Sequence, residues 1–213
     1  MTTADRGDAP SMGALSKHAE PRKAPPDTQS WWAEVNSLDL AVYAAIAATP
    51  TPTLDCVFRR LSRAADNSKL WIASAAALAT VGGPGGRRAA VNGLASVAVT
   101  SAVVNLVLKP LGRRQRPDRA IHHVPITRQV TMPRTTSFPS GHAASASAFA
   151  TGVASAAPVA GIPVSTAATL VAYSRVHTGV HYPLDVIAGS LTGEALALLT
   201  VAALARRRRR LDR

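Results

Sequence analysis

The chain has 213 residues, a formal net charge of +12 and a pI near 11.3, and hydrophobic residues make up 47% of it. Its single cysteine, Cys56, excludes an intrachain disulfide and a Cys-rich metal site. So basic a chain could bind nucleic acid, but aromatic residues are only 4% and no binding motif interleaves them with the basic residues. The charge lies instead in short basic stretches between apolar runs, which indicates a multi-pass protein of the cell membrane.

The N-terminal segment is polar and rich in proline, without the apolar core of a signal peptide. We therefore expect a disordered polar tail over residues 1–36. Trp31 and Trp32 are typical of the aromatic belt at a membrane surface, with two ordinary core aromatics as the alternative. Leu38–Ala48 is too short to span a bilayer and residues 54–63 are amphipathic, so we expect two short helices at the interface.

Five apolar runs follow and predict an all-α, polytopic membrane helix bundle of about five to six spans. We expect the membrane domain to cover residues 37–205 and a basic C-terminal tail to cover residues 206–213. The predicted spans are Leu70–Val81, Ala89–Leu108, Gly141–Ala160, Val164–Tyr173 and Leu184–Ala205.

Glycine, proline and one acid define the limits and faces of these spans. The glycine-rich residues 82–86 separate the first two spans, and Gly161-Ile-Pro163 closes the third. In the fifth span, Gly189 and Gly193 form a small-residue face for close helix contact. Glu194 lies beside them, and we expect it to face the bundle interior through a hydrogen bond.

A polar turn from Ser174 to Asp185 joins the last two apolar runs. It carries Arg175, His177, His181 and Asp185. Such a cluster costs free energy between apolar helices unless it has a function; the alternative is a hairpin tip whose side chains face water. Pro183 suits the first turn of a helix, which would bring Asp185 close to His181. The carboxylate could then fix the imidazole tautomer and leave its other nitrogen as a nucleophile or base.

Two more polar clusters lie on the same side of the membrane as this turn, because consecutive spans alternate in direction. The second span ends in Lys109-x6-Arg116-Pro117, and the third begins at Pro139-Ser140-Gly141-His142. Ser140 is a good N-cap, and Gly141 lets a ligand approach the free N–H groups of the helix start. Three polar clusters on one face indicate a functional site.

The residue types in these clusters suit phosphoryl transfer. The cations Lys109, Arg116 and Arg175, with a helix N-terminus, favour phosphate over carboxylate. One histidine can attack phosphorus while the other protonates the leaving oxygen. No Asp/Glu cluster of the kind that holds magnesium accompanies them, so we expect neither a metal nor a cofactor. These features predict transfer through a phosphohistidine, with positive charge stabilising the transferred group.

The three clusters, with Ser174-Arg175-x5-His181-x3-Asp185 as the third, resemble the signature of the type 2 phosphatidic acid phosphatase superfamily. Every specified residue is present and in order, and the resemblance covers roughly residues 37–205. It implies that His181 is the nucleophile, that Asp185 orients it and that His142 protonates the leaving group. It also implies that the phosphate oxygens are held by Lys109, Arg116, Ser140, Gly141 and Arg175.

The signature gives no role to the other histidines or to the basic loop. His177 is at best a supporting residue, and we expect His122 and His123 to be solvated loop residues. The loop over residues 110–138 is expected to cover the site or to contact anionic head groups, with plain solvation as the alternative. Its arginines include Arg113, Arg114, Arg119, Arg128 and Arg134.

A site at the rim of a membrane bundle implies a lipid-linked phosphate as substrate. The superfamily also contains bacterial acid phosphatases and vanadium haloperoxidases, but the apolar spans argue against a haloperoxidase. More narrowly, residues 49–71 and 92–117 are similar to actinobacterial decaprenylphosphoryl-5-phosphoribose phosphatases of cell-wall arabinan precursor synthesis. The alternatives are a polyprenyl diphosphate or phosphatidylglycerophosphate phosphatase, and a non-enzymatic basic membrane scaffold. The basic residues divide too evenly between the two faces to orient the site.

Overall fold

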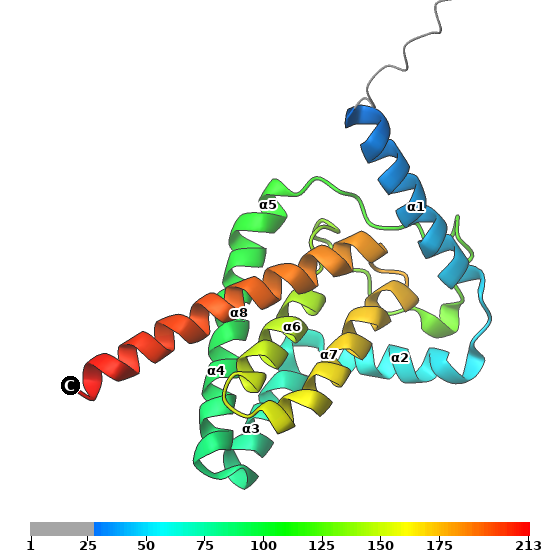
Figure 1. The fold of residues 1–213 in the computed structure, drawn as a ribbon. Coiled ribbons are helices and arrows are strands. Elements are labelled where there is room, and N and C mark those ends of the chain that lie inside the picture. Colours follow the sequence, from blue (N-terminus) through cyan, green and yellow to red (C-terminus); the bar gives the residue numbers. More distant parts are fainter. Residues whose placement is uncertain (1–27) are drawn as a thin grey trace, which may run out of the picture.

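The computed structural model describes residues 28–213 as a bundle of helices, with no strand in that range (Figure 1). The helices are α1 (Thr28–Ala48), α2 (Pro52–Ala64), η1 (Asp66–Ser68), α3 (Lys69–Val81), α4 (Gly83–Val103), η2 (Val104–Leu108), α5 (Lys109–Leu111), η3 (Ile126–Arg128), α6 (Gly141–Ala154), α7 (Pro158–His177) and α8 (Pro183–Leu211). The prediction of an all-α membrane bundle is therefore confirmed.

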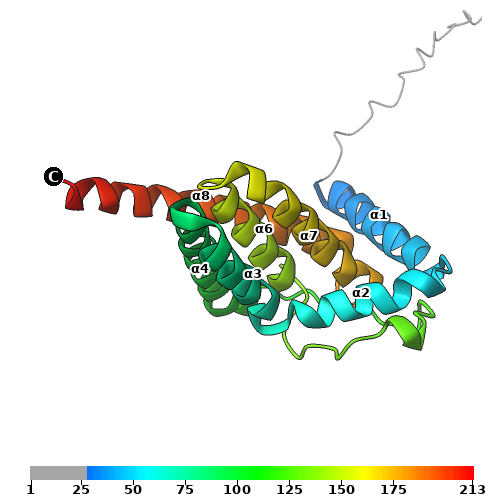
Figure 2. The same cartoon turned by 90° about the horizontal axis from the view of Figure 1, so that it is seen from below.

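The N-terminal helix is longer than the sequence suggested. Of the expected disordered tail over residues 1–36, residues 1–27 lie outside the described residues, while residues 28–36 form the first turns of α1. Trp31 and Trp32 are 52% and 59% exposed, which excludes two core aromatics. α1 meets α2 at a bend of 117°, where Pro52 starts the second helix (Figure 2). Only α2 is thus a short helix of the expected length.

The second predicted span is one long helical segment. α4 continues through the π-helix η2 into α5, from Gly83 to Leu111, a length of 29 residues. The break before it is a tight turn at Gly82 and Gly83, and Gly83 has a φ of +58°. The rest of the glycine run belongs to the first turn of α4, where Pro84 needs no N–H partner.

The prediction for residues 141–160 was wrong at its C-terminal end. α6 stops at Ala154, and α7 starts at Pro158, so the residues expected to close the span lie inside α7. Gly161 provides close contact there rather than a break, since a Cβ on it would lie 2.8 Å from the Cβ of Ala154. Pro163 is accommodated within the same helix.

α8 extends beyond the bundle at its C-terminal end (Figures 1 and 2). The arginines at 206–210, expected in a tail, are helical up to Leu211. Two segments, Gly83–Leu111 and Pro183–Leu211, are long and apolar enough to cross a membrane, and α1 with α2 would add a third if the bent pair is one span. The number of five to six spans therefore remains a prediction.

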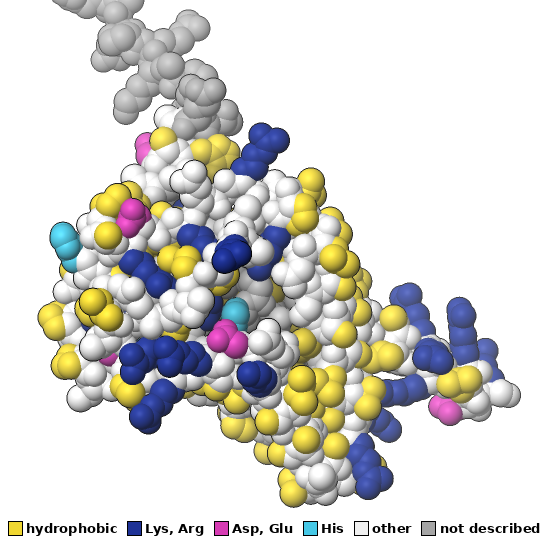
Figure 3. Space-filling view, turned by 180° about the vertical axis from the view of Figure 1, so that it is seen from behind, with side chains coloured by type: hydrophobic (Ala, Val, Ile, Leu, Met, Phe, Trp, Pro, Cys, Tyr) yellow, Lys and Arg dark blue, Asp and Glu magenta, His cyan; other side chains and the backbone are white. Residues whose placement is uncertain are grey.

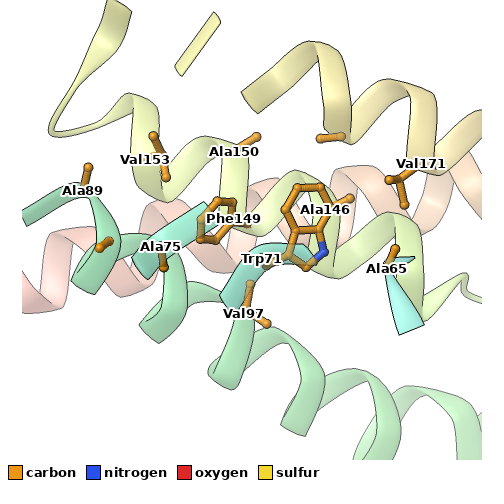
Figure 4. Packing of buried hydrophobic residues seen from close by; sticks show 12 residues of the cluster. Ala65, Trp71, Ala75, Ala89, Val97, Ala146, Phe149, Ala150, Val153 and Val171 are labelled. Carbon is orange, nitrogen blue, oxygen red and sulfur yellow. The ribbon is translucent and has the colours of Figure 1, made fainter. Parts of the chain in front are cut away.

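Small residues allow the helices to pack closely around α6. Figure 4 shows the core, where the rings of Trp71 and Phe149 lie 5.3 Å apart among alanine and valine side chains. The small face of α8 packs on α6 as expected, since a Cβ on Gly193 would lie 2.0 Å from the carbonyl oxygen of Ala144. Glu194 departs from expectation because it is exposed and lines an apolar groove instead of the interior. Its neighbour Gly193 occupies the inward face of the helix.

Candidate active site

The structure brings the three polar clusters together at one end of the bundle. Lys109 lies near the C-terminal end of the segment from α4 to α5. Its Nζ lies 3.3 Å from Thr135 Oγ1 and 3.5 Å from the position that a Cβ on Gly141 would take. Arg116 reaches the α7–α8 turn, with Nη1 3.2 Å from Nε2 of His181. On this face Lys and Arg side chains surround a hollow that has a histidine and an acidic side chain at its edge (Figure 3).

His181 and Asp185 lie beside each other at the start of α8. Pro183 begins the helix as predicted, and the Asp185 carboxylate accepts the N–H of Tyr182 at 2.9 Å. The same carboxylate lies 3.5 Å from Nδ1 of His181. Nδ1 therefore carries the proton, and the lone pair of Nε2 faces Arg116. This is the arrangement that a nucleophilic imidazole needs.

The environment of His181 keeps the imidazole neutral. The side chain is 2% exposed, and this burial lowers its pKa to about 3 although the bond to Asp185 acts in the opposite direction. Arg116 and Arg175 lower the pKa further, because a protonated ring would face two cations. At neutral pH Nε2 thus keeps its lone pair, as a nucleophile or base requires.

Two side chains from outside the signature hold Asp185 in place. Arg114 donates Nη1 to Asp185 at 2.8 Å, and its Nη2 pairs with Asp39 of α1. Ser137 donates its hydroxyl to Asp185 at 2.5 Å. Sequence reasoning missed Asp39 and Ser137, and it assigned Arg114 to the covering loop. An acid on α1 and a basic loop give no sign in sequence that they meet at α8.

His142 has a carboxylate partner that the sequence did not reveal. Its Nε2 lies 2.8 Å from Oδ1 of Asp66, on the turn between α2 and α3. This hydrogen bond is the main cause that holds the pKa of Asp66 below its usual value. Asn67 and Ser68 after it have positive φ values of 52° and 59°, so the backbone there is held in an uncommon conformation. The turn thus presents an ionised acid to His142.

The start of α6 is built as predicted. Ser140 is the N-cap, and its hydroxyl accepts the N–H of Ala143. Its own N–H donates to the carbonyl oxygen of Asp185 at 2.9 Å, which ties the two helix starts together. A Cβ on Gly189 would lie 2.4 Å from the Ser140 carbonyl, so the small residue allows this contact.

Arg175 is a buried cation that forms no salt bridge within residues 28–213, although the Asp66 carboxylate acts on it through space. It is 1% exposed, its Nη1 donates to Ser62, and its Nε has no hydrogen-bond partner within residues 28–213. Nη2 of Arg119 is another buried guanidinium nitrogen that lacks a partner in the same part of the chain. Unpaired buried donors are costly, and a bound anion would satisfy them. The site therefore suits an anion with several oxygens.

The basic loop is held by the protein more than by solvent. Arg128 is fully buried and donates Nε to Asp55 of α2 at 2.7 Å. Arg119 donates to the carbonyl oxygens of Gly179 and Val130. Among the loop arginines discussed above, only Arg113 and Arg134 are exposed. The loop is thus anchored by Arg119 and Arg128. These two arginines are neither fully solvated nor part of a movable cover.

Three further histidines of the described residues have partners other than Lys109, Arg116 and Arg175. His177 is buried between Phe58 and Tyr173, and its Nε2 contacts Asp55 at 3.1 Å. His122 packs edge-on against Tyr43, so it is not a fully solvated residue, whereas His123 is exposed. No three His, Cys, Asp or Glu side chains come together as a metal site within the described part of the chain.

Comparisons with known proteins agree with this arrangement. A family model described as the PAP2 superfamily matches residues 90–209. The chain is 39% identical over 155 residues to the decaprenylphosphoryl-5-phosphoribose phosphatase of Mycolicibacterium smegmatis, which covers 70% of this chain and 78% of the relative. Among solved structures, the PAP2-type phosphatidylglycerolphosphate phosphatase of Bacillus subtilis superposes with a TM-score of 0.61 at 26% identity, covering 81% of this chain and 87% of the other. LpxE of Aquifex aeolicus shares the fold, with a TM-score of 0.65 at 23% identity and coverage of 78% and 95%.

Proposed function

Since the chain belongs to the PAP2 superfamily and is a membrane lipid phosphatase, we propose that it hydrolyses decaprenylphosphoryl-5-phosphoribose to decaprenylphosphoryl ribose and phosphate. This reaction would belong to cell-wall arabinan precursor synthesis. The observation that carries the chemistry is that a neutral His181 lies in one site with the buried guanidinium of Arg175, whose Nε lacks a hydrogen-bond partner among the described residues. The likeness to the Mycolicibacterium smegmatis enzyme supports the choice of substrate.

The proposed reaction has two steps. Nε2 of His181 attacks phosphorus, and the bond from phosphorus to the leaving oxygen breaks as His142 gives that oxygen a proton. His142 then takes a proton from water, the water oxygen attacks the phosphohistidine, and phosphate leaves while Nε2 regains its lone pair. Asp185 keeps the proton on Nδ1 throughout.

The cations are assigned to the charge that the phosphoryl group carries. Lys109, Arg116 and Arg175 would bind its oxygens, together with the hydroxyl of Ser140 and the N–H of Gly141. Arg175 gains the partner that its Nε lacks. A non-enzymatic scaffold would gain nothing from a buried arginine whose Nε has no hydrogen-bond partner among the described residues. An enzyme therefore explains this site better than a scaffold.

A substrate panel in detergent tests this function. We expect the highest kcat/KM for decaprenylphosphoryl-5-phosphoribose when it is compared with a polyprenyl diphosphate, phosphatidic acid and phosphatidylglycerophosphate. Phosphate release is expected to continue in EDTA and to be inhibited by vanadate, which mimics the transferred group. A higher kcat/KM for the diphosphate or for phosphatidylglycerophosphate would contradict the substrate, and a strict magnesium requirement would contradict the metal-free chemistry.

A further inference from the structure

A cavity of about 250 Å³ opens beside His142. It lies between the α2–α3 turn, the end of α4 with η2, and the first turns of α6. Three residues of the proposed phosphate site, Lys109, Gly141 and His142, form part of its wall. The cavity is therefore a direct continuation of that site, on the side of the proposed acid.

Apart from Ala65 and Val104, the rest of the wall is polar, although two of its helices belong to the membrane bundle. Its polar residues are Asn67, Ser68, Ser101, Asn105 and Ser145. The hydroxyls of Ser101 on α4 and Ser145 on α6 lie 3.2 Å apart. The amide nitrogen of Asn105 donates to the carbonyl oxygen of Ser101 at 2.9 Å, which leaves its side-chain oxygen to accept from a ligand. Hydroxyls and an amide thus lie in one place.

The π-helix η2 explains how this wall is formed. Leu106 and Val107 are 76% and 49% exposed and face away from the cavity, whereas Asn105 and Lys109 line it. The wider turn of a π-helix re-aims side chains within an otherwise regular helix, and such segments are frequent at functional sites. Asn105 in η2 and Lys109 directly after it are four positions apart, a spacing that places both side chains on one helix face toward the cavity.

The lining favours one kind of leaving group over the others. Hydroxyls and amides both donate and accept, as the neighbouring hydroxyls of a sugar require. Lys109 is the only lysine or arginine among the described lining residues, so a second phosphate on the leaving group would find no further ammonium or guanidinium group. The cavity volume of about 250 Å³ is sufficient for a small sugar ring.

We propose that this cavity is the leaving-group subsite and that it binds the hydroxyls of the sugar from which phosphate is removed, with Asn105, Ser101 and Ser145 as specificity residues. The assignment rests on the proposed function, because His142 must protonate the leaving oxygen for the sugar to lie on this side. The isoprenoid part of the substrate would then extend outward from the cavity to the membrane.

Two variants and a matched control test the assignment in the full chain purified in detergent. Asn105→Ala removes the amide at an exposed helix position, and Ser145→Val replaces the hydroxyl with two methyl groups. Ser147→Val is the control, because Ser147 lies on the same helix but lines the apolar groove on its other side. The measured quantity is the ratio of kcat/KM for decaprenylphosphoryl-5-phosphoribose to that for phosphatidic acid, whose leaving group is a diacylglycerol.

We expect each cavity variant to lower this ratio about tenfold, the effect of about one lost hydrogen bond, and the control to leave it unchanged. Retained turnover of phosphatidic acid shows that a variant is folded. An unchanged ratio in both variants, with a wild type active on the phosphosugar lipid, overturns the subsite and leaves the proposed function intact. A wild type that hydrolyses other lipid phosphates but not the phosphosugar lipid overturns the proposed function, and the sugar subsite with it.

Discussion

Asp66 is the acid that contacts the proposed general acid His142. The hydrogen bond of 2.8 Å to Nε2 of His142 stabilises the ionised acid and, equally, the protonated imidazole. A general acid must be protonated when the substrate is bound, and buried cations nearby oppose that state. We therefore infer that Asp66 positions His142 and helps it to keep its proton.

The substitution Asp66→Asn tests this role. We expect kcat to fall about 10–100-fold, which is the range for a weakened acid catalyst, and the basic limb of the kcat–pH profile to move to lower pH. The shift follows because the neutral amide no longer favours the charged imidazole. A loss of stability alone would lower activity equally at every pH.

Glu34→Gln is the matched control, since Glu34 is an exposed acid on α1. It should leave both kcat and the pH profile unchanged. An Asp66→Asn profile that superposes on that of the wild type would show that Asp66 has no part in proton transfer.

At the residue scale, the sequence predicted the signature residues but not their partners. His181 and Asp185 lie four positions apart at a helix start, so their contact follows from local geometry. Asp66 and His142 are 76 positions apart, and Arg114 and Asp39 are 75 apart. Such pairs depend on how the helices pack, for which a single sequence carries no periodic signal.

At the scale of helices, the contact between α6 and α8 determines how the two halves of the site meet. α6 presents Ser140 and His142, and α8 begins beside His181. Gly189 and Gly193 let the two backbones approach to within van der Waals contact. The small face on α8 was visible in the sequence, but its partner helix was not.

Gly193→Ala tests this contact. The new Cβ would lie 2.0 Å from the Ala144 carbonyl, so the helices must separate, and we expect the free energy of unfolding in detergent to fall by about 1–3 kcal/mol. A thermal melt with a denaturant titration would measure it. Gly85→Ala is the control, because a Cβ there meets nothing within 4 Å and alanine is the better helix former. Equal stability of the two variants would contradict the close packing.

The helix ends show where sequence reasoning failed. Gly161 and Pro163 suggested a break, yet α7 runs through both, because the glycine serves contact with Ala154 and the helix accepts Pro163 in its interior at the cost of one backbone hydrogen bond. The arginines at 206–210 suggested a tail, but arginine is a good helix former and continues α8. Packing thus outweighed the glycine and proline signal in α7, and helix propensity outweighed the charge signal at the end of α8.

At the scale of the whole molecule, one end of the bundle carries the chemistry. The α2–α3 turn, the end of α4, the start of α6 and the α7–α8 turn all meet there. A buried ion pair between Asp55 and Arg128 holds the loop over residues 110–138 against the bend between α1 and α2. Alternation of the predicted spans was enough to place three of these four segments on one face. The fourth, the α2–α3 turn, joins a helix expected at the interface to the first predicted span, and its acid was given no role.

The central claim is that phosphate passes through His181. The most direct measurement is rapid mixing of the purified protein with substrate labelled in the phosphate, stopped with alkaline detergent and followed by a search for acid-labile, base-stable label on the chain. We expect label on His181 in the wild type and none in His181→Ala. That variant should stay folded but lose turnover at least ~10³-fold. Absence of label in a wild type whose dephosphorylation step is rate-limiting, or undiminished label and turnover in His181→Ala, would contradict this claim.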